Sequence, residues 1–276
     1  MSGSLVKSAS WGAASLVGAA ILAGPALADG MSSRGRIASE PGSRACSTAG
    51  NVGITSDYVF RGISQTGNNA ALQGGVDLTC GNFYVGLWGS NIEGVGNSLE
   101  LDLYGGYKFT TGKINWDIGV IYYAYPGATS SLDQAFLELK LGASGDVWKG
   151  GTLGGTVYYA PEGQHVINGG LNGDPGAVTT VEANFSQALP RFSIFSPTIS
   201  ATVGHVSFEN NVNVPADGKG STDPNYTYWN AGVTLGFHQR WSLDLRYWDT
   251  NGEGLAGQFG GDLADERFVA TLKATF

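Results

Sequence analysis

Hydrophobic and polar side chains alternate along much of this chain. Between residues 99 and 109 the odd positions hold leucine, glycine, tyrosine or phenylalanine, whereas the even positions include Glu100, Asp102 and Lys108. A period of two sends successive side chains to opposite faces of a strand, and a helix could not separate the two sets in this way. The pattern resumes over residues 114–123 after a short turn. These residues therefore predict an antiparallel hairpin with one apolar and one polar face.

Segments of this kind continue to the end of the sequence. The predicted strands are 51–63, 70–80, 83–90, 98–110, 113–125, 132–142, 151–161, 178–188, 198–208, 226–237, 241–250 and 266–276. Most connectors alternate between short turns and longer stretches rich in Gly, Asn and Asp, as at the two ends of an outer-membrane barrel. The first outer connector, 64–69, is short for its kind. The pattern predicts an all-β fold, a transmembrane antiparallel up-and-down β-barrel of about twelve strands.

The composition favours the same class of protein. Only 14% of the residues are charged, and 44 are glycine, whereas a soluble domain has roughly 25% charged residues. The mean hydropathy is −0.04, as expected when polar side chains face the inside of a barrel and apolar ones face lipid. A helical membrane protein would need repeated apolar runs of about 18 residues or more, and the one comparable run lies at the N-terminus.

That N-terminal run has the features of an export signal. Lys7 precedes an apolar stretch, and Ala26 and Ala28 place small residues where a signal peptidase reads them. The alternative is a membrane anchor, which the interruption by Gly24 and Pro25 disfavours. The predicted organisation is a cleaved signal peptide at 1–28, a polar periplasmic segment at 29–49 and a transmembrane barrel at 50–276.

The predicted mature chain is acidic. Of the 15 Lys and Arg residues only Lys7 lies within 1–28, which leaves 14 basic against 23 acidic residues and a net charge of −9. This balance argues against nucleic acid as a partner.

The last predicted strand ends the chain on an aromatic residue. Phe268, Leu272 and Phe276 share its apolar face, while Arg267 and Lys273 lie on the other. This arrangement resembles outer-membrane proteins, which commonly end in an amphipathic strand with a terminal Phe. The resemblance implies that the three apolar residues form a C-terminal insertion signal read by the barrel-insertion machinery. An edge strand of a soluble sandwich is the alternative, but it leaves the other alternating segments and the export signal unexplained.

A closer resemblance lies in the first half of the sequence. The stretches 51–66, 71–75, 88–91, 99–104 and 122–127 resemble the TorF-type putative porin family of proteobacteria. The similarity is densest over residues 50–140. It implies a barrel in the outer membrane of a Gram-negative bacterium, in contact with outer-membrane lipid and lipopolysaccharide.

The polar strand faces should surround the lumen. The charged residues predicted to line it are Asp57, Arg61, Asp77, Glu100, Asp102, Lys108, Asp117, Glu138, Lys140, Glu182, Asp244, Arg246, Arg267 and Lys273. Lumen aromatics are predicted at Trp88, Tyr104, Tyr123, Tyr158, Tyr228 and Trp248, and interfacial aromatic girdles at Tyr58, Trp116, Tyr122, Tyr159, Trp229, Trp241 and Tyr247. Glu138 with Lys140 and Asp244 with Arg246 form same-face pairs two residues apart, and Asp57 and Arg61 share a face four residues apart. The acidic excess predicts cation preference if the lumen conducts, whereas a complete ion-pair network would close it.

Two cysteines occur in the sequence, Cys46 and Cys80. Cys46 lies just before the first predicted strand and Cys80 ends the second, so an antiparallel hairpin returns both to the periplasmic rim. A disulfide is predicted there, provided the Cα atoms come within about 7 Å.

Catalysis is the main competing interpretation. His205 and Ser207 are two residues apart and could present a base beside a nucleophile, with a bulge at Gly204 turning His205 into the lumen. No third, orienting residue is evident, so the sequence predicts no enzyme. The histidines His165, His205 and His238 fall in different segments, which predicts no metal site and no cofactor.

Together these features predict an outer-membrane, porin-like channel. A barrel of about twelve strands has a narrow interior compared with 16 to 18 strands, and the expected cargo is ions or small polar solutes that diffuse passively. Two alternatives stay open: a closed barrel with a structural or surface-recognition role through its outer loops, and an outer-membrane lipid hydrolase.

Overall fold

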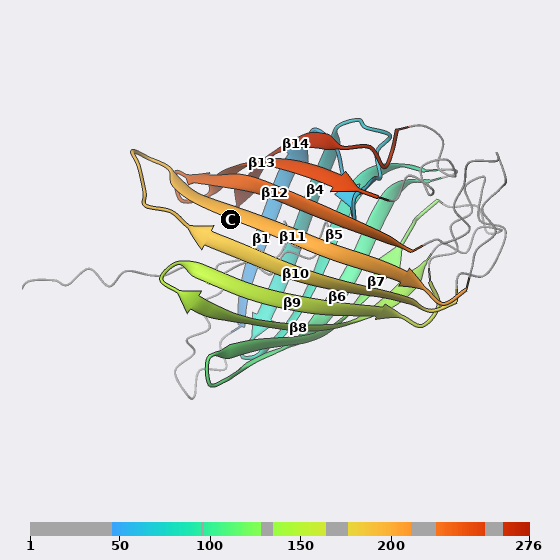
Figure 1. The fold of residues 1–276 in the computed structure, drawn as a ribbon, viewed down its shortest axis with the longest axis horizontal. Coiled ribbons are helices and arrows are strands. Elements are labelled where there is room, and N and C mark those ends of the chain that lie inside the picture. Colours follow the sequence, from blue (N-terminus) through green and yellow to red (C-terminus); the bar gives the residue numbers. More distant parts are fainter. Residues whose placement is uncertain (1–45, 95–96, 128–134, 164–175, 211–224, 252–261) are drawn as a thin grey trace, which may run out of the picture.

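The computed structural model describes residues 46–94, 97–127, 135–163, 176–210, 225–251 and 262–276. Within them, twelve antiparallel strands form one closed barrel (Figure 1). These strands are β1 (Cys46–Thr55), β4 (Ala71–Cys80), β5 (Phe83–Gly94), β6 (Asn97–Thr111), β7 (Ile114–Ala124), β8 (Phe136–Trp148), β9 (Gly151–Ala160), β10 (Val178–Ala188), β11 (Ser196–Phe208), β12 (Tyr226–Phe237), β13 (Trp241–Thr250) and β14 (Arg267–Thr275). The predicted fold class is confirmed. The predicted signal peptide at 1–28 lies outside the described residues, as do residues 29–45 of the predicted segment 29–49.

Alternation of side chains builds the wall of the barrel. In β8, Leu137, Leu139 and Leu141 are exposed on the outside, while Glu138 and Lys140 between them are buried inside. The same division holds along the other strands, because a period of two puts every second side chain on the same face. The outer surface is therefore an apolar band suited to lipid, and the interior is polar and aromatic.

The barrel closes where its first strand meets its last. β1 pairs with β4 on one side and with β14 on the other. Asn51 lies opposite Thr275, and Gly50 and Phe276 exchange both main-chain hydrogen bonds, at 2.8 and 2.9 Å. We call this the terminal end of the barrel. We call the opposite end, where β1 leads into the connection towards β4, the loop end.

Tyrosine rings inside the barrel lie over glycines on neighbouring strands. A Cβ atom at Gly204 would overlap the ring of Tyr228, and one at Gly86 would overlap the ring of Tyr104. These close approaches need glycine, because a larger residue would push the rings off the wall.

Strand bounds differ most from the sequence prediction in β8 and β1. β8 continues to Trp148, so the predicted connector 143–150 shrinks to Lys149 and Gly150, the latter with a φ of +77°. β1 begins at Cys46 and ends at Thr55, whereas the predicted strand ran from 51 to 63.

The larger difference is a segment that leaves the wall between β1 and β4. We call residues 56–70 the inserted segment. It holds a two-stranded pair, β2 (Val59–Phe60) and β3 (Ile63–Ser64), which is separate from the barrel sheet. Within it, residues 57–66 are buried or half-buried on both parities, because the wall surrounds the segment. The predicted short connector at 64–69 is therefore wrong. Hydrophobic and polar residues still alternate beyond Thr55, so the sequence pattern does not show where the chain leaves the wall and turns inward.

Tyr58 shows the consequence of this inward turn. It was expected in an interfacial girdle, but it lies on the inserted segment and only 2% of it is exposed. Four other predicted girdle residues are exposed on the outer face: Tyr122, Tyr159, Trp229 and Trp241. No helix in the described part of the chain is both long enough and apolar enough to cross a membrane.

Candidate functional site

The lumen collects the charged residues singled out by the sequence. Twelve of the fourteen lie on inward-facing strand positions, and Asp57 and Arg61 lie on the inserted segment. The deeply buried members are Asp57, Arg61, Asp77, Glu100, Asp102, Asp117, Glu138, Lys140 and Glu182, and the half-buried members are Lys108, Asp244, Arg246, Arg267 and Lys273. Whether they line a conducting pore stays a prediction.

Arg61 sits at the tip of the inserted segment and binds Glu138 on β8. Its Nη1 and Nη2 atoms donate to Oε1 and Oε2 of Glu138 at 2.7 and 2.9 Å. The hydroxyl of Tyr123 donates to the same carboxylate at 3.0 Å. The guanidinium carbon lies 4.8 Å from the ring centre of Phe60 and 5.0 Å from that of Tyr158. This is a bidentate, charge-assisted pair with two aromatic neighbours.

The tip also reaches the opposite wall. A Cβ atom at Gly62 would lie 2.9 Å from Cβ of Tyr228 on β12 and 3.0 Å from Cβ of Thr250 on β13. Arg61 and Gly62 both have positive φ, +49° and +85°, as in the two-residue turns that join β-hairpins. The tip therefore spans the lumen from β12 and β13 to β8.

Asp57 anchors the base of the inserted segment. Its Oδ1 accepts hydrogen bonds from the hydroxyls of Ser64 and Thr66 at 2.6 and 2.8 Å. Its Oδ2 accepts from Nη1 of Arg267 at 2.9 Å, where β14 begins. The main chain adds three links, from Ser56 N to Ala270 O, from Ser64 N to Leu263 O and from Glu93 N to Gln65 O. The segment is thus tied to the wall by side-chain charges and a few main-chain bonds.

Apolar side chains fill the space around this tip. Val59 and Ile63 of the inserted segment belong to one buried cluster with wall residues such as Trp88, Phe136 and Val206. Tyr228 and Asp102 have an exposure of 0%. At this level the lumen is packed, because solvent does not reach the side chains of Tyr228 and Asp102.

Three carboxylates at this level pair with no cation among the described residues. Glu100 accepts a hydrogen bond from the hydroxyl of Tyr58 at 2.8 Å, and Glu182 accepts one from the hydroxyl of Tyr228. Neither oxygen of Asp102 has a hydrogen-bond donor. The ion pairs found in the described residues involve other carboxylates. The packed level is therefore rich in uncompensated acid.

Elsewhere in the lumen, two ion pairs lie along the wall. Lys140 on β8 donates to Asp117 on β7 at 2.8 Å, and the hydroxyl of Tyr84 donates to the other oxygen of Asp117. Arg246 and Asp244 form a bidentate pair within β13, at 3.0 Å for each bond. These contacts hold side chains against the strands.

One of the two predicted pairs forms, that between Asp244 and Arg246. Glu138 pairs with Arg61 instead of Lys140, and Asp57 pairs with Arg267 instead of Arg61. The difference arises because spacing along one strand cannot show that Arg61 has left the wall. The missed residues Ser64 and Thr66 follow the only useful signal, an Arg-Gly step between two short alternating runs, which is typical of a tight hairpin.

The candidate catalytic pair faces outward. β11 pairs with both neighbours without a register shift, so the bulge expected at Gly204 is absent from this strand. His205 is exposed on the outer face and bonds Thr227 at 2.8 Å, while Val206 points inward. The prediction that His205 turns into the lumen is wrong. Within the described residues no group of three or more His, Cys, Asp or Glu could hold a metal, and His165 lies outside them.

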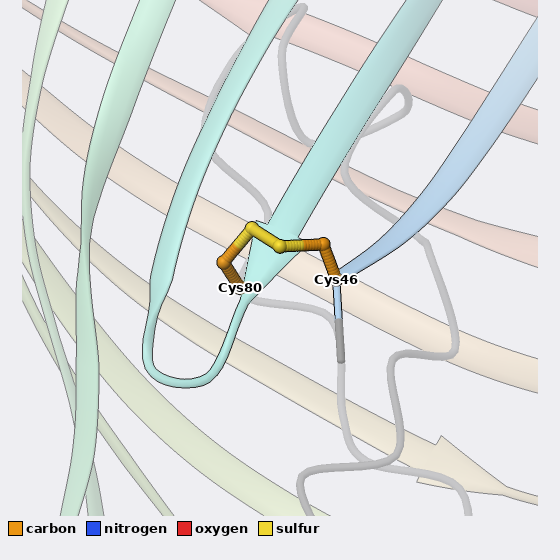
Figure 2. Close-up of a disulfide and its surroundings, with 2 residues drawn as sticks. All are labelled: Cys46 and Cys80. Carbon is orange, nitrogen blue, oxygen red and sulfur yellow. A yellow bond between two sulfur atoms is a disulfide. The ribbon is translucent and has the colours of Figure 1, made fainter. Parts of the chain in front are cut away.

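A disulfide joins Cys46 and Cys80 at the terminal end of the barrel (Figure 2). The two residues are register partners in the β1–β4 ladder, with Cα atoms 4.2 Å apart. Cys80 ends β4 beside the turn into β5. The link therefore fixes the start of the barrel wall, far along β1 from the inserted segment.

Solved structures of porins have a similar fold. A structure titled "NanC porin structure in rhombohedral crystal form" aligns with 83% of this chain and 99% of its own, with a TM-score of 0.50 and 10% identity. A structure titled "KdgM porin" aligns over the same shares with a TM-score of 0.51 and 8% identity, and another contains that porin "in complex with disordered oligogalacturonate". The fold is thus that of outer-membrane porins.

Sequence comparison identifies the family. No protein of curated function matches the sequence. Residues 39–276 match a family described as "Bacterial protein of unknown function (Gcw_chp)", whereas the resemblance to TorF-type porins stays a prediction. Because this match covers most of the sequence, the chain belongs to the Gcw_chp family of bacterial proteins.

Proposed function

We propose that this protein is a narrow outer-membrane channel through which ions or small polar solutes diffuse passively. The observation that carries the proposal is a closed barrel with an apolar outside and a lumen lined by charged and aromatic side chains. Similarity in fold to porins supports it. Passage through such a barrel needs no cofactor and no covalent step, so the proposal includes no enzymatic activity.

The charge of the lumen favours cations. Eight of the fourteen charged lumen residues are acidic and six are basic, and Glu100, Asp102 and Glu182 pair with no basic side chain among the described residues. A lumen of this sign attracts cations and repels anions. The oligogalacturonate in the KdgM complex is an anionic sugar chain. We therefore expect this lumen to reject such a chain and to prefer small cations.

In this proposal the inserted segment sets the bore. Its tip spans the lumen, so the packed state conducts little and passage requires the segment to move or to leave a side path. We further propose that the chain is exported by a cleaved signal peptide at 1–28, that Phe268, Leu272 and Phe276 guide insertion, and that lipopolysaccharide surrounds the outer leaflet end.

The test is single-channel current from protein extracted from outer membranes and placed in a planar bilayer with a salt gradient. Discrete steps with a reversal potential on the cation side would support the channel. Protein that is folded, as judged by its heat-modifiable migration, and that gives no steps would contradict it. The second candidate, a closed barrel with a structural or surface role, would then be preferred, because the packing around the inserted segment favours it.

A further inference from the structure

Arg61 is held in the manner of a bound ligand. Two nitrogens of its guanidinium meet the two oxygens of Glu138, and aromatic rings from Phe60 and Tyr158 lie near the guanidinium carbon. Its Nε is buried and makes no hydrogen bond. Recognition therefore involves only the terminal nitrogens and the aromatic contacts, which any alkylguanidinium presents.

Most of this receptor belongs to the wall. Glu138 lies on β8, Tyr123 on the neighbouring β7 and Tyr158 on the neighbouring β9. The Tyr123 hydroxyl donates to Glu138 and orients the carboxylate that Arg61 binds. Phe60 alone comes from the inserted segment. The wall would keep a carboxylate, a hydroxyl and an aromatic ring if the segment withdrew.

The backbone conformation at Arg61 indicates that its side chain is required at this position. Its φ of +49° lies in the left-handed region, which is unfavourable for a residue other than glycine. Glycine or asparagine would suit this position of the turn better. The contacts made by the guanidinium offset that cost, so the turn is built to deliver an arginine to Glu138.

The surroundings hold more carboxyl groups than Arg61 binds. Glu100, Asp102 and Glu182 are buried at the same level and pair with no cation in the described part of the chain. Removing Arg61 would leave Glu138 uncompensated as well, at a substantial cost in a low-dielectric interior. The wall is therefore left with a strong demand for a cation when the segment moves.

We propose that Glu138, Tyr123 and Tyr158 form a binding site for guanidinium-bearing solutes, and that Arg61 occupies this site as an internal competitor. The inference rests on the proposed channel for its biological use, because it names the class of solute that would displace Arg61 during passage. A guanidinium is preferred over a simple ammonium, since only the planar fork matches both carboxylate oxygens and lies against the rings.

The test is rescue of Arg61→Ala protein by ethylguanidinium, with urea and NaCl as neutral and ionic controls. Ethylguanidinium at millimolar concentration is expected to raise the thermal midpoint of Arg61→Ala by several degrees, because it binds the folded barrel. Urea and NaCl at the same concentration are expected to have no such effect. The variant Arg61→Ala/Glu138→Gln should not respond, because it lacks the carboxylate.

Arg267→Ala is the matched control for the loss of a lumen arginine. Its partner Asp57 keeps the hydroxyls of Ser64 and Thr66, so ethylguanidinium should not stabilise this variant. Equal shifts in both variants, or no shift in Arg61→Ala, would overturn the proposed site.

A second measurement uses the wild-type protein and does not depend on whether a variant folds. Ethylguanidinium should compete with Arg61 and raise the open probability of the channel at a concentration at least about tenfold below that needed for NaCl or urea. Equal effects of all three would overturn the site while leaving the channel itself supported. If ethylguanidinium stabilises Arg61→Ala but the protein gives no current, the guanidinium site is supported and the channel is contradicted.

Discussion

The wall of the barrel and the inserted segment are held together by different forces. Each wall strand forms main-chain ladders with two neighbours, such as the uninterrupted pairing of β10 with β11 from Val178 to Ala188. The inserted segment has strands of two residues and is held by two ion pairs, Asp57 with Arg267 and Arg61 with Glu138, by a few hydrogen bonds and by apolar packing against the wall. The wall should therefore determine whether the protein folds, and the segment should determine how much of the lumen is open. Mutations can separate these two properties.

Removing the segment should produce the largest effect. Replacing residues 58–66 by a Gly/Ser linker of equal length removes the tip and the Tyr58 contact but leaves all twelve wall strands. We expect single-channel conductance to rise several-fold, because the packed level of the lumen loses its central element. Heat-modifiable migration should persist. Unchanged conductance in a folded variant would show that the segment does not set the bore.

Breaking the ion pair at the tip should have the next largest effect. Glu138→Gln leaves Arg61 buried without its carboxylate, a change that costs about 3–5 kcal/mol in buried pairs. Because the segment has few other bonds, it should leave the packed position more often, and the measurement is the frequency of opening in bilayer recordings.

Asp244→Asn is the control for the tip variant. It breaks a half-buried pair within β13, away from the inserted segment, and should leave opening frequency unchanged. Equal opening in both variants would contradict a special role for the tip.

Removing the disulfide should affect the wall and spare the lumen. Cys46→Ser/Cys80→Ser opens a link between residues 34 apart, which contributes about 2–4 kcal/mol in chain-entropy estimates. We expect a lower midpoint of urea unfolding with unchanged conductance, because the link lies at the terminal end (Figure 2). A changed conductance would show that the two ends of the barrel are coupled.

Neutralising the acidic pair on β6 should give the smallest shift. Glu100→Gln/Asp102→Asn removes two carboxylates that pair with no described cation, so the lumen becomes less selective for cations. The reversal potential in a salt gradient should move towards zero by several millivolts. An unchanged reversal potential would reject these residues as determinants of selectivity.

The wall could be predicted from the sequence, and the inserted segment could not. A strand facing lipid on one side carries its own signal, because a residue such as Leu139 between Glu138 and Lys140 has no other explanation. Residues 57–60 continue the alternation with a period of two, although they lie inside the barrel and the wall surrounds them on every side. Alternation alone cannot distinguish a strand in the wall from a segment inside the barrel. The sequence pattern therefore places the start of the inserted segment in the first strand.

The sequence predicts which residues lie in the lumen site, but it does not predict which residues they pair with. Period two correctly sends Glu138 and Asp117 inward, because that follows from the strand itself. The partner of each depends on which strands are adjacent and where the inserted segment crosses the barrel. Arg61 lies 77 residues from Glu138 in sequence, and no local pattern links them.

The most direct measurement is current through a barrel whose inserted segment can be tethered and released. Gly62→Cys/Thr250→Cys would place two Cβ atoms about 3.0 Å apart, close enough for a disulfide between the tip and β13 once the chain shifts. The cysteine at position 62 is strained by the φ of +85° and by Cβ of Tyr228, so the folding of this variant is verified first by heat-modifiable migration. The background is Cys46→Ser/Cys80→Ser, in which this is the only possible disulfide. The account predicts that oxidised protein gives no steps and that reductant restores them in the same bilayer. Equal conductance before and after reduction, with the tether verified by mass, would contradict the claim that the inserted segment controls the bore.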